Sequence, residues 1–167
     1  MIRRPEVALA SSDTYIGIKR LEAEMASAAF SVDELLGVTG RSARGALAVA
    51  RSIQDGLSVQ AVERVAAAVA PGDSSFRYRL VPKPTLDRRK RSGQRLTSDE
   101  GNRVARLAKA YAMAMTVFGD ETKALAFLSR PHQMLDGETP VEVALATGPG
   151  ADEVVNLLGA AAAGVAV

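Results

Sequence analysis

The residues of this chain best suited to chemistry are the basic and hydroxyl side chains between positions 83 and 95. Long cationic side chains bind phosphate, and the planar guanidinium of arginine can donate two hydrogen bonds to a phosphate or a guanine edge. Short flanking helices would present them as a helix-turn-helix does. A basic run can also be no more than a solvated face, so the flanking helices carry this expectation. The candidate DNA-binding residues are Lys83, Thr85, Arg88, Arg89, Lys90, Arg91 and Arg95.

The remaining reactive side chains do not assemble into an enzyme or a metal centre. The chain has one histidine, His132, and no cysteine, so we expect His132 to be structural rather than a metal ligand. The acidic pair Asp152-Glu153 is expected to stabilise the first turn of a helix through its dipole. Gly148-Pro-Gly150 lacks the Lys-Ser/Thr of a phosphate-binding loop. We therefore expect no catalytic residue, no metal and no cofactor.

Charge is distributed unevenly along the chain. The net charge is only +2, but residues 77–106 carry ten Lys/Arg and three acids, whereas residues 107–167 carry three basic residues and seven acids. These counts give +7 for the middle of the chain and −4 for its end. A basic middle and an acidic end predict two different partners.

Composition indicates an all-α protein. Apolar residues make up 47% of the chain and aromatic residues only 4%, with alanine the dominant apolar type, which favours closely packed helices. No segment alternates apolar and polar residues as a strand would. Neither a run of about 18 apolar residues nor a secretory signal is present. We expect a soluble, cytoplasmic protein without a membrane partner.

Capping signals and apolar periodicity define the helices that must position the basic residues. Two stretches match a capping box, Ser31–Glu34 and Thr97–Glu100. Ser42 and Ser58 are expected to start further helices, and Pro84 suits the first turn of the basic one. The longest helix should bury one face, made of Val104, Leu107, Ala108, Tyr111, Met115 and Phe118. We expect helices over about 13–28, 31–36, 42–54, 59–70, 74–80, 84–91 and 98–118.

The segment from Phe127 to Val167 ends in an apolar helix. Turn signals at 135–137, 139–140 and 148–150 divide the segment into short helices. The last helix carries Val154, Val155, Leu157 and Leu158, followed by four alanines, Gly164 and Val165-Ala166-Val167. Chain ends without a partner usually fray. An apolar end therefore predicts that another surface covers this helix, and such a helix is suited to a groove.

Together these motifs resemble the Xre/MbcA/ParS group of antitoxins, above all those paired with RES-domain toxins. The group's toxin-binding domain has a pattern matched here by Pro131, Leu135-Asp-Gly137, Pro140, Thr147, Gly150, Val154, Leu158-Gly159 and Gly164. Its helix-turn-helix region is matched by Gly56-Leu57, Thr85-Leu-Asp-Arg-Arg89, Leu96-Thr-Ser-Asp-Glu100 and Arg106-Leu-Ala108, and its junction by Val117-Phe-Gly-Asp120. Each motif is weak alone, but their order and spacing over about residues 56–167 make the combination specific.

The resemblance implies a type II antitoxin with two functions. Members of the group bind a toxin through the C-terminal domain and repress their own operon through the helix-turn-helix. RES toxins deplete NAD, and the antitoxin's last helix blocks the toxin's active-site entrance. The implied domains are a helical N-terminal segment (1–55), an Xre-like helix-turn-helix domain (56–118) and a toxin-binding domain (119–167). The candidate toxin-binding residues are Arg130, Val154, Leu157, Leu158, Ala160, Ala163, Gly164, Val165 and Val167.

The chain departs from this group in its last helix. Where the group usually has an arginine and an aromatic residue that enter the toxin site, this chain has Ala160 and Ala163. Alanine favours a helix but offers neither charge nor hydrogen bonds. Our hypothesis is that the chain folds and docks but neutralises its toxin less well, since each lost anchor could weaken binding by about 2 kcal/mol.

A second hypothesis remains open at this point. The chain could be a helix-turn-helix repressor whose C-terminal domain serves only for dimerisation. Both hypotheses predict operator DNA as a partner and a homodimer, or in the first case a larger toxin–antitoxin complex. They differ in what the last helix contacts.

Overall fold

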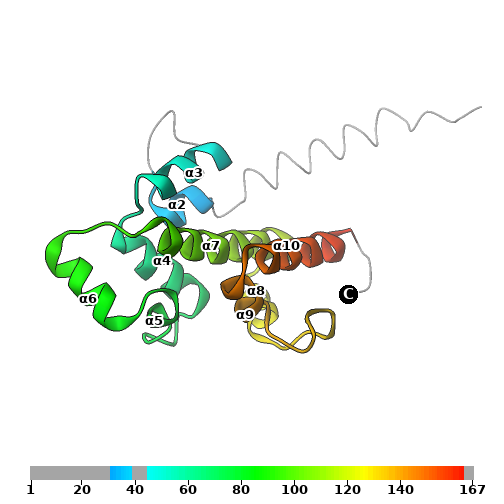
Figure 1. Ribbon diagram of the computed structural model, residues 1–167. Coiled ribbons are helices and arrows are strands. Elements are labelled where there is room, and N and C mark those ends of the chain that lie inside the picture. The colour runs from blue at the N-terminus through cyan, green and yellow to red at the C-terminus, as the bar shows by residue number, and fades with distance from the viewer. Residues whose placement is uncertain (1–30, 39–44, 164–167) are drawn as a thin grey trace, which may run out of the picture.

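The computed structural model describes residues 31–38 and 45–163, and this part of the chain is all helical, as predicted (Figure 1). The predicted helix over 13–28 and the predicted cap Ser42 lie outside the described residues. The elements are α2 (Val32–Leu36), α3 (Ala46–Gln54), α4 (Val59–Val69), α5 (Arg77–Leu80), α6 (Lys83–Ser92), α7 (Ser98–Phe118), α8 (Glu121–Ser129), the 3-10 helix η1 (Gln133–Leu135), α9 (Pro140–Ala146) and α10 (Gly148–Ala162).

Helix α7 is the axis of the molecule. It contacts α2, α3, α4 and α5 toward one end and α8, α9 and α10 toward the other, and α10 lies alongside it (Figure 1). Its predicted start is confirmed, because the Thr97 hydroxyl accepts from the Glu100 amide and the Glu100 carboxylate accepts from the Thr97 amide. Gly119, with φ of 60°, ends the helix in the left-handed conformation that glycine adopts without strain.

The core follows the predicted apolar face of α7 for most of its length. Val104, Leu107 and Ala108 are fully buried, and Tyr111 is nearly so. Burial raises the pKa of the Tyr111 hydroxyl, with the Glu121 charge acting in the same direction. Met115 and Phe118, predicted on the same face, are only half buried. The cause is position, because the last turns of α7 lie at the edge of the core.

Two local predictions were wrong. At α2 the Ser31 side chain makes no capping hydrogen bond; instead Leu35 and Leu36 are buried, and the Arg64 Nε donates to the Leu35 carbonyl at 2.9 Å. Tertiary contacts thus stabilise this five-residue helix in place of a cap.

The second wrong prediction concerns the C-terminal helix α10, which starts earlier than expected. Thr147 caps it and Gly148-Pro-Gly150 forms its first turn. Asp152 and Glu153 therefore lie beyond that turn, and Asp152 instead pairs with Lys109 of α7 at 2.9 Å.

In the described part of the chain no helix is long and apolar enough to cross a membrane.

Candidate nucleic-acid interface and toxin-binding face

The basic helix α6 follows α5 through a two-residue turn. Val81 is extended (φ −137°, ψ 126°), and Pro82 precedes the first residue of α6 with φ of −52°. Leu80, Val81 and Leu86 are fully buried and fix this corner to the core. Pro84 lies in the first turn of α6, where its missing amide hydrogen breaks no helical bond. Helix α5 and the turn at Val81-Pro82 thus hold α6 at one end of the molecule.

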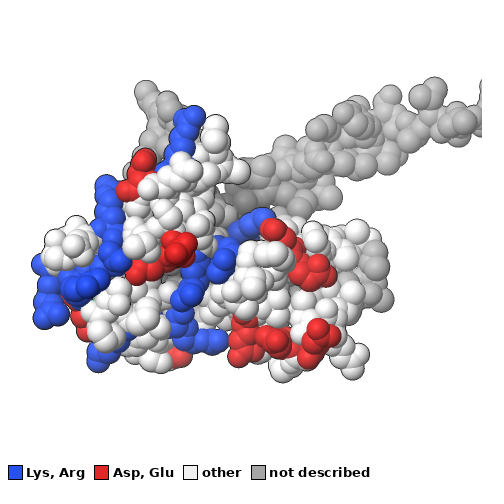
Figure 2. All heavy atoms as spheres, in the orientation of Figure 1, with Lys and Arg blue, Asp and Glu red and all other residues white. Residues whose placement is uncertain are grey.

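The outer face of α6 is rich in unpaired positive charge. Lys83, Arg88 and Arg91 are exposed, and Thr85 is half buried. Arg88 and Arg91 form no ion pair with any described residue. Figure 2 shows Lys and Arg gathered over the end that carries α6, with acidic side chains toward the α9–α10 end. Such a surface can bind a polyanion by displacing its counterions.

Three of the predicted DNA-binding side chains also have polar partners within the protein, although Lys90 and Arg95 remain exposed. The Arg89 guanidinium lies 3.1 Å from the Glu100 carboxylate and donates to the Arg95 carbonyl at 2.8 Å. The Lys90 ammonium pairs with Glu63 of α4 at 2.6 Å. The Arg95 guanidinium donates to the Gly56 carbonyl at 2.8 Å. The structure therefore divides the predicted set into side chains that bond to described residues and side chains that form no hydrogen bond or ion pair with them.

Glu63 joins three helices. Its carboxylate accepts from Arg77 of α5 at 2.8 Å and from Lys90 of α6. Burial acts to raise the pKa of Glu63, but the hydrogen bonds and charges of Lys90 and Arg77 outweigh it and hold that pKa below its ordinary value. The sequence did not single out Glu63, because its partners lie 14 and 27 positions away.

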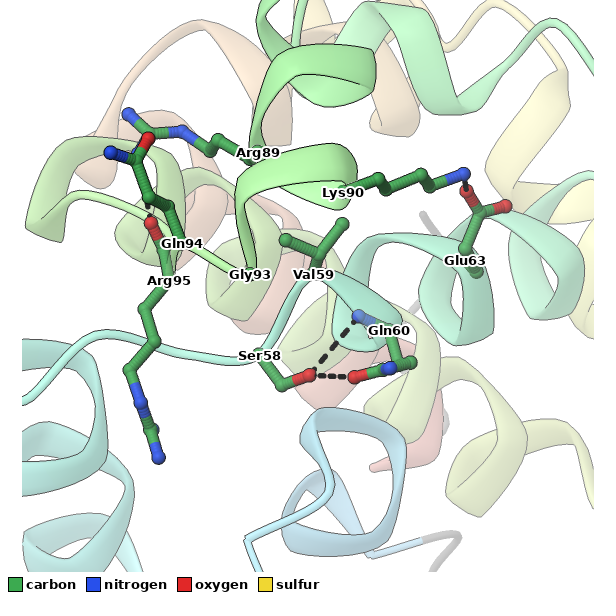
Figure 3. Close-up of a pocket in the computed structure, with 9 residues that line it drawn as sticks. All are labelled: Ser58, Val59, Gln60, Glu63, Arg89, Lys90, Gly93, Gln94 and Arg95. Atoms are coloured by element: carbon green, nitrogen blue, oxygen red, sulfur yellow. Dashed lines mark hydrogen bonds and ion pairs between the residues drawn. The ribbon is translucent and has the colours of Figure 1, made fainter.

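A groove of about 420 Å³ runs between the start of α4 and the end of α6 (Figure 3). Ser58, Gln60 and Glu63 line one side, and Lys90, Gly93 and Gln94 line the other. Arg89 and Arg95 also line the groove, and the Arg95 guanidinium donates to the Gly56 carbonyl. The Lys90–Glu63 pair and Arg95 therefore border the same groove.

Two further exposed arginines lie near the turn and were not predicted as site residues. Arg103 of α7 contacts the Leu80 carbonyl at 3.5 Å. Arg79 of α5 lies over the Phe76 ring and 3.8 Å from Glu142 of α9. Their positions in separate helices hid this proximity from the sequence.

The C-terminal half places its apolar residues differently from our expectation. Val154 and Leu158 are fully buried and Leu157 is 4% exposed, in the core that α10 shares with α7 and α9. The expectation that these three side chains form a toxin-facing surface is therefore wrong. A helix face covered by a partner and one covered by the protein's own core have the same sequence pattern.

The open side of α10 carries the acids Asp152 and Glu153 near its start and short side chains toward its end. Asp152, Asn156 and Ala163 are exposed, Ala160 is half buried, and a Cβ at Gly159 would meet no atom within 4 Å. Gly150 differs, since a Cβ there would lie 2.4 Å from the Val143 carbonyl oxygen and prevent α9 and α10 from packing. Arg130 is exposed at the end of α8. The predicted residues Gly164, Val165 and Val167 lie outside the described residues.

The loop after α8 is a compact turn built around His132. The His132 amide donates to the Glu138 carbonyl, and the His132 carbonyl accepts from Gly137, both at 3.0 Å. Its Nδ1 accepts from the Met134 amide at 3.3 Å, and Met134 is 58% exposed. His132 therefore orders this loop, and no group of metal-ligating side chains occurs among the described residues.

Comparison with known proteins identifies both halves. Residues 48–109 match the Antitoxin Xre-like helix-turn-helix domain, and residues 113–164 match the Antitoxin Xre/MbcA/ParS C-terminal toxin-binding domain. The chain is 33% identical over 110 residues to an Antitoxin Xre of Yersinia enterocolitica, covering 65% of this chain and 74% of that relative. The chain belongs to the Xre family of antitoxins. The predicted resemblance to this family is confirmed.

An Antitoxin Xre of Pseudomonas putida is also similar, at 39% identity over 82 residues. That match covers 49% of this Xre-family chain and about half, 51%, of the relative's length. The two domain matches meet between residues 109 and 113, inside α7, so one continuous helix belongs to both halves.

Proposed function

We propose that this chain is an antitoxin that binds a cognate toxin through its C-terminal half and represses its own operon through α5 and α6. The observation that carries the proposal is that an Xre-like helix-turn-helix and a toxin-binding domain share α7 in one chain. The exposed Arg88 and Arg91 support DNA binding, because neither forms an ion pair with a described residue and such cations can take phosphate partners. The proposed activity is binding at both surfaces, without catalysis or a cofactor.

We further propose that the toxin is a RES-domain protein that degrades NAD, and that the end of α10 covers its active site. The buried side of α10 supports this idea, because it holds the helix formed before the toxin arrives. A preformed helix loses less conformational entropy on binding. Ala160 and Ala163 lie on the last turns, where the contact would be made. Arg130, Gly164, Val165 and Val167 remain proposed contacts.

The run Ala160–Ala163 supports incomplete neutralisation. A methyl group can fill space in a toxin site but cannot pair with a charged or polar group there. We expect the double variant Ala160→Arg and Ala163→Tyr to bind the toxin more tightly by about 2 kcal/mol or more, if either residue acts as an anchor.

The test uses co-expression with the protein encoded beside this gene, which we expect to contain a RES domain. Growth, cellular NAD and binding affinity are measured for the wild type, for the double variant and for Ala67→Arg, a matched control at an exposed alanine of α4. Protection that rises only in the double variant supports the proposal. Equal affinity and equal growth in all three would refute the weakened-plug hypothesis, and the absence of any complex would refute the RES assignment.

A point substitution separates this function from a repressor whose C-terminal domain only dimerises. Deleting 151–167 would remove buried Ala151, Val154 and Leu158 and so disturb the core itself. The exposed Asn156 is a better site. We expect Asn156→Arg to weaken toxin binding and to leave the oligomeric state and DNA binding unchanged. Loss of dimers together with loss of DNA binding would support the repressor instead.

A further inference from the structure

Arg89 stands out on α6 because each of its three guanidinium nitrogens donates to a group within the protein. Its side chain is only 12% exposed. The Nε and one terminal nitrogen donate to Glu100 at 3.3 and 3.2 Å, and the other terminal nitrogen donates to the Arg95 carbonyl at 2.8 Å. Arg88, one residue earlier, is exposed and makes no ion pair with a described residue. Two adjacent arginines therefore have opposite environments.

Glu100 links this arginine to the start of α7. Its carboxylate accepts both from Arg89 and from the Thr97 amide, the latter at 2.8 Å. The same residue thus completes the α7 capping box and fixes the end of α6. A charged pair that is mostly shielded from solvent and has several hydrogen bonds holds its geometry more firmly than an exposed pair.

The loop between α6 and α7 is held from its other side as well. The Leu96 amide donates to the Leu57 carbonyl at 2.9 Å, and Arg95 donates to the Gly56 carbonyl at 2.8 Å. Gly56 has φ of 86°, and a Cβ there would lie 2.9 Å from the Leu96 carbonyl oxygen. The loop therefore lies between the α3–α4 corner and Arg89, so the end of α6 has little freedom to turn.

We propose that Arg89 is a positioning residue, which with Glu100 sets the orientation of α6 so that Arg88 and Arg91 face the DNA. This inference rests on the proposed DNA binding. It predicts that breaking the pair lowers sequence discrimination without removing a phosphate contact. If Arg89 instead contacted the DNA directly, breaking its pair with Glu100 would tighten DNA binding, because Glu100 would no longer compete with DNA for the same guanidinium.

The variant Glu100→Gln separates these two cases by the sign of its effect. Glutamine keeps the capping box but removes the charge that Arg89 pairs with. We expect binding to the DNA immediately upstream of the gene to weaken by about tenfold, the size of one lost charged hydrogen bond. Binding to a shuffled duplex of the same length should stay equal or tighten. Asp99→Asn is the matched control, since Asp99 is an exposed acid in the same turn without an ion pair to any described residue. It should change neither affinity by more than a few-fold.

A second pair of variants tests the inference through salt dependence on the shuffled duplex. Arg88→Gln should reduce the slope of log affinity against log salt by about one, as expected for one lost phosphate contact. Arg89→Gln should leave that slope unchanged while lowering affinity for the upstream DNA. Tighter upstream binding by Glu100→Gln, or an equal loss of slope in both arginine variants, overturns the inference. If the wild type binds neither duplex, the proposed function itself fails and the positioning role falls with it.

Discussion

On the outer face of α6 the side chains that reach solvent are long cations, whereas on the open side of the last two turns of α10 they are short. Both helices are anchored by a fully buried leucine, Leu86 in one and Leu158 in the other. Arg88 and Arg91 can reach a phosphate several ångströms from the helix, but Gly159 and Ala163 permit contact only with a partner that approaches the backbone closely. A buried leucine thus anchors both helices, although α6 is suited to a charged partner and the end of α10 to a partner of complementary shape.

The difference also shows how each surface can fail. Leu86 anchors α6 in the core, but the helix is also held by polar contacts such as Arg89–Glu100 and Lys90–Glu63, which single substitutions can remove while the core remains. At α10, positioning depends on the core itself. Substitutions on its buried side should therefore affect stability before they affect binding.

The largest expected effect comes from the buried side of α10. Leu158→Ala should lower the free energy of unfolding by about 2–5 kcal/mol, because it leaves a cavity in a fully buried site. Urea unfolding followed by circular dichroism measures this change. The control Asn156→Ala, at an exposed site, should stay within about 0.5 kcal/mol. An unchanged unfolding midpoint in Leu158→Ala, together with lost toxin binding, would instead indicate that Leu158 contacts the toxin.

The next effect concerns the charged face. The double variant Arg88→Ala and Arg91→Ala should reduce the salt slope of DNA binding by about two, one unit for each phosphate contact. Titration of a labelled duplex at several salt concentrations measures the slope. Thermal unfolding should be almost unchanged, since neither side chain pairs with a described residue. A slope equal to that of the wild type would place the DNA elsewhere.

A smaller effect is expected at Gly159. Gly159→Ala should stabilise the protein by about 1 kcal/mol, because alanine has the higher helix propensity and a Cβ meets no atom there. If a partner's backbone approaches α10 closely, the same methyl group should weaken toxin binding. Paired unfolding and affinity measurements reveal the two opposite changes. Stabilisation without any loss of affinity would show that the toxin does not approach this point.

The smallest effect is pH dependent. Glu63 has its pKa lowered in the folded state, so its charge stabilises the fold above the ordinary value of 4.5, and this contribution disappears as pH falls through the lower folded-state pKa. Glu63→Gln should therefore destabilise the protein at pH 7 by less than about 1 kcal/mol, because the pairs are partly exposed. The difference between variant and wild type should vanish in acid. Glu153→Gln, at an exposed acid, serves as the control. A difference independent of pH would mean that charge is not the cause.

Much of the fold could be predicted from the sequence because its helix boundaries depend on nearby residues. The Ser58 cap and the Thr97–Glu100 box act within three residues, and both are present. The pairs Arg89–Glu100 and Arg95–Gly56 are different. They form only when the corners between helices meet, at separations of 11 and 39 residues. A list of basic residues therefore could not separate the arginines with partners inside the protein from those without a described partner.

The candidate toxin-binding face could be predicted only in part, for a related reason. The apolar pattern of Val154, Leu157 and Leu158 shows that one side of α10 is covered, but it does not name the covering surface. The structure assigns that role to the protein's own core. The small residues Gly159 and Ala163 carry little sequence signal, although they define the side that stays open.

Helix α7 has a geometric consequence for any assembly on DNA. Its 21 residues form a rod of about 30 Å that belongs to both halves, and Arg106 of the rod donates to the Leu145 carbonyl of α9 at 3.1 Å. A toxin bound at α10 would therefore keep a fixed orientation relative to the DNA bound at α6. Antitoxin chains bound at neighbouring operator sites would hold their toxins at angles set by the DNA helical repeat, because the continuous helix α7, rather than a flexible linker, joins the two halves of each chain.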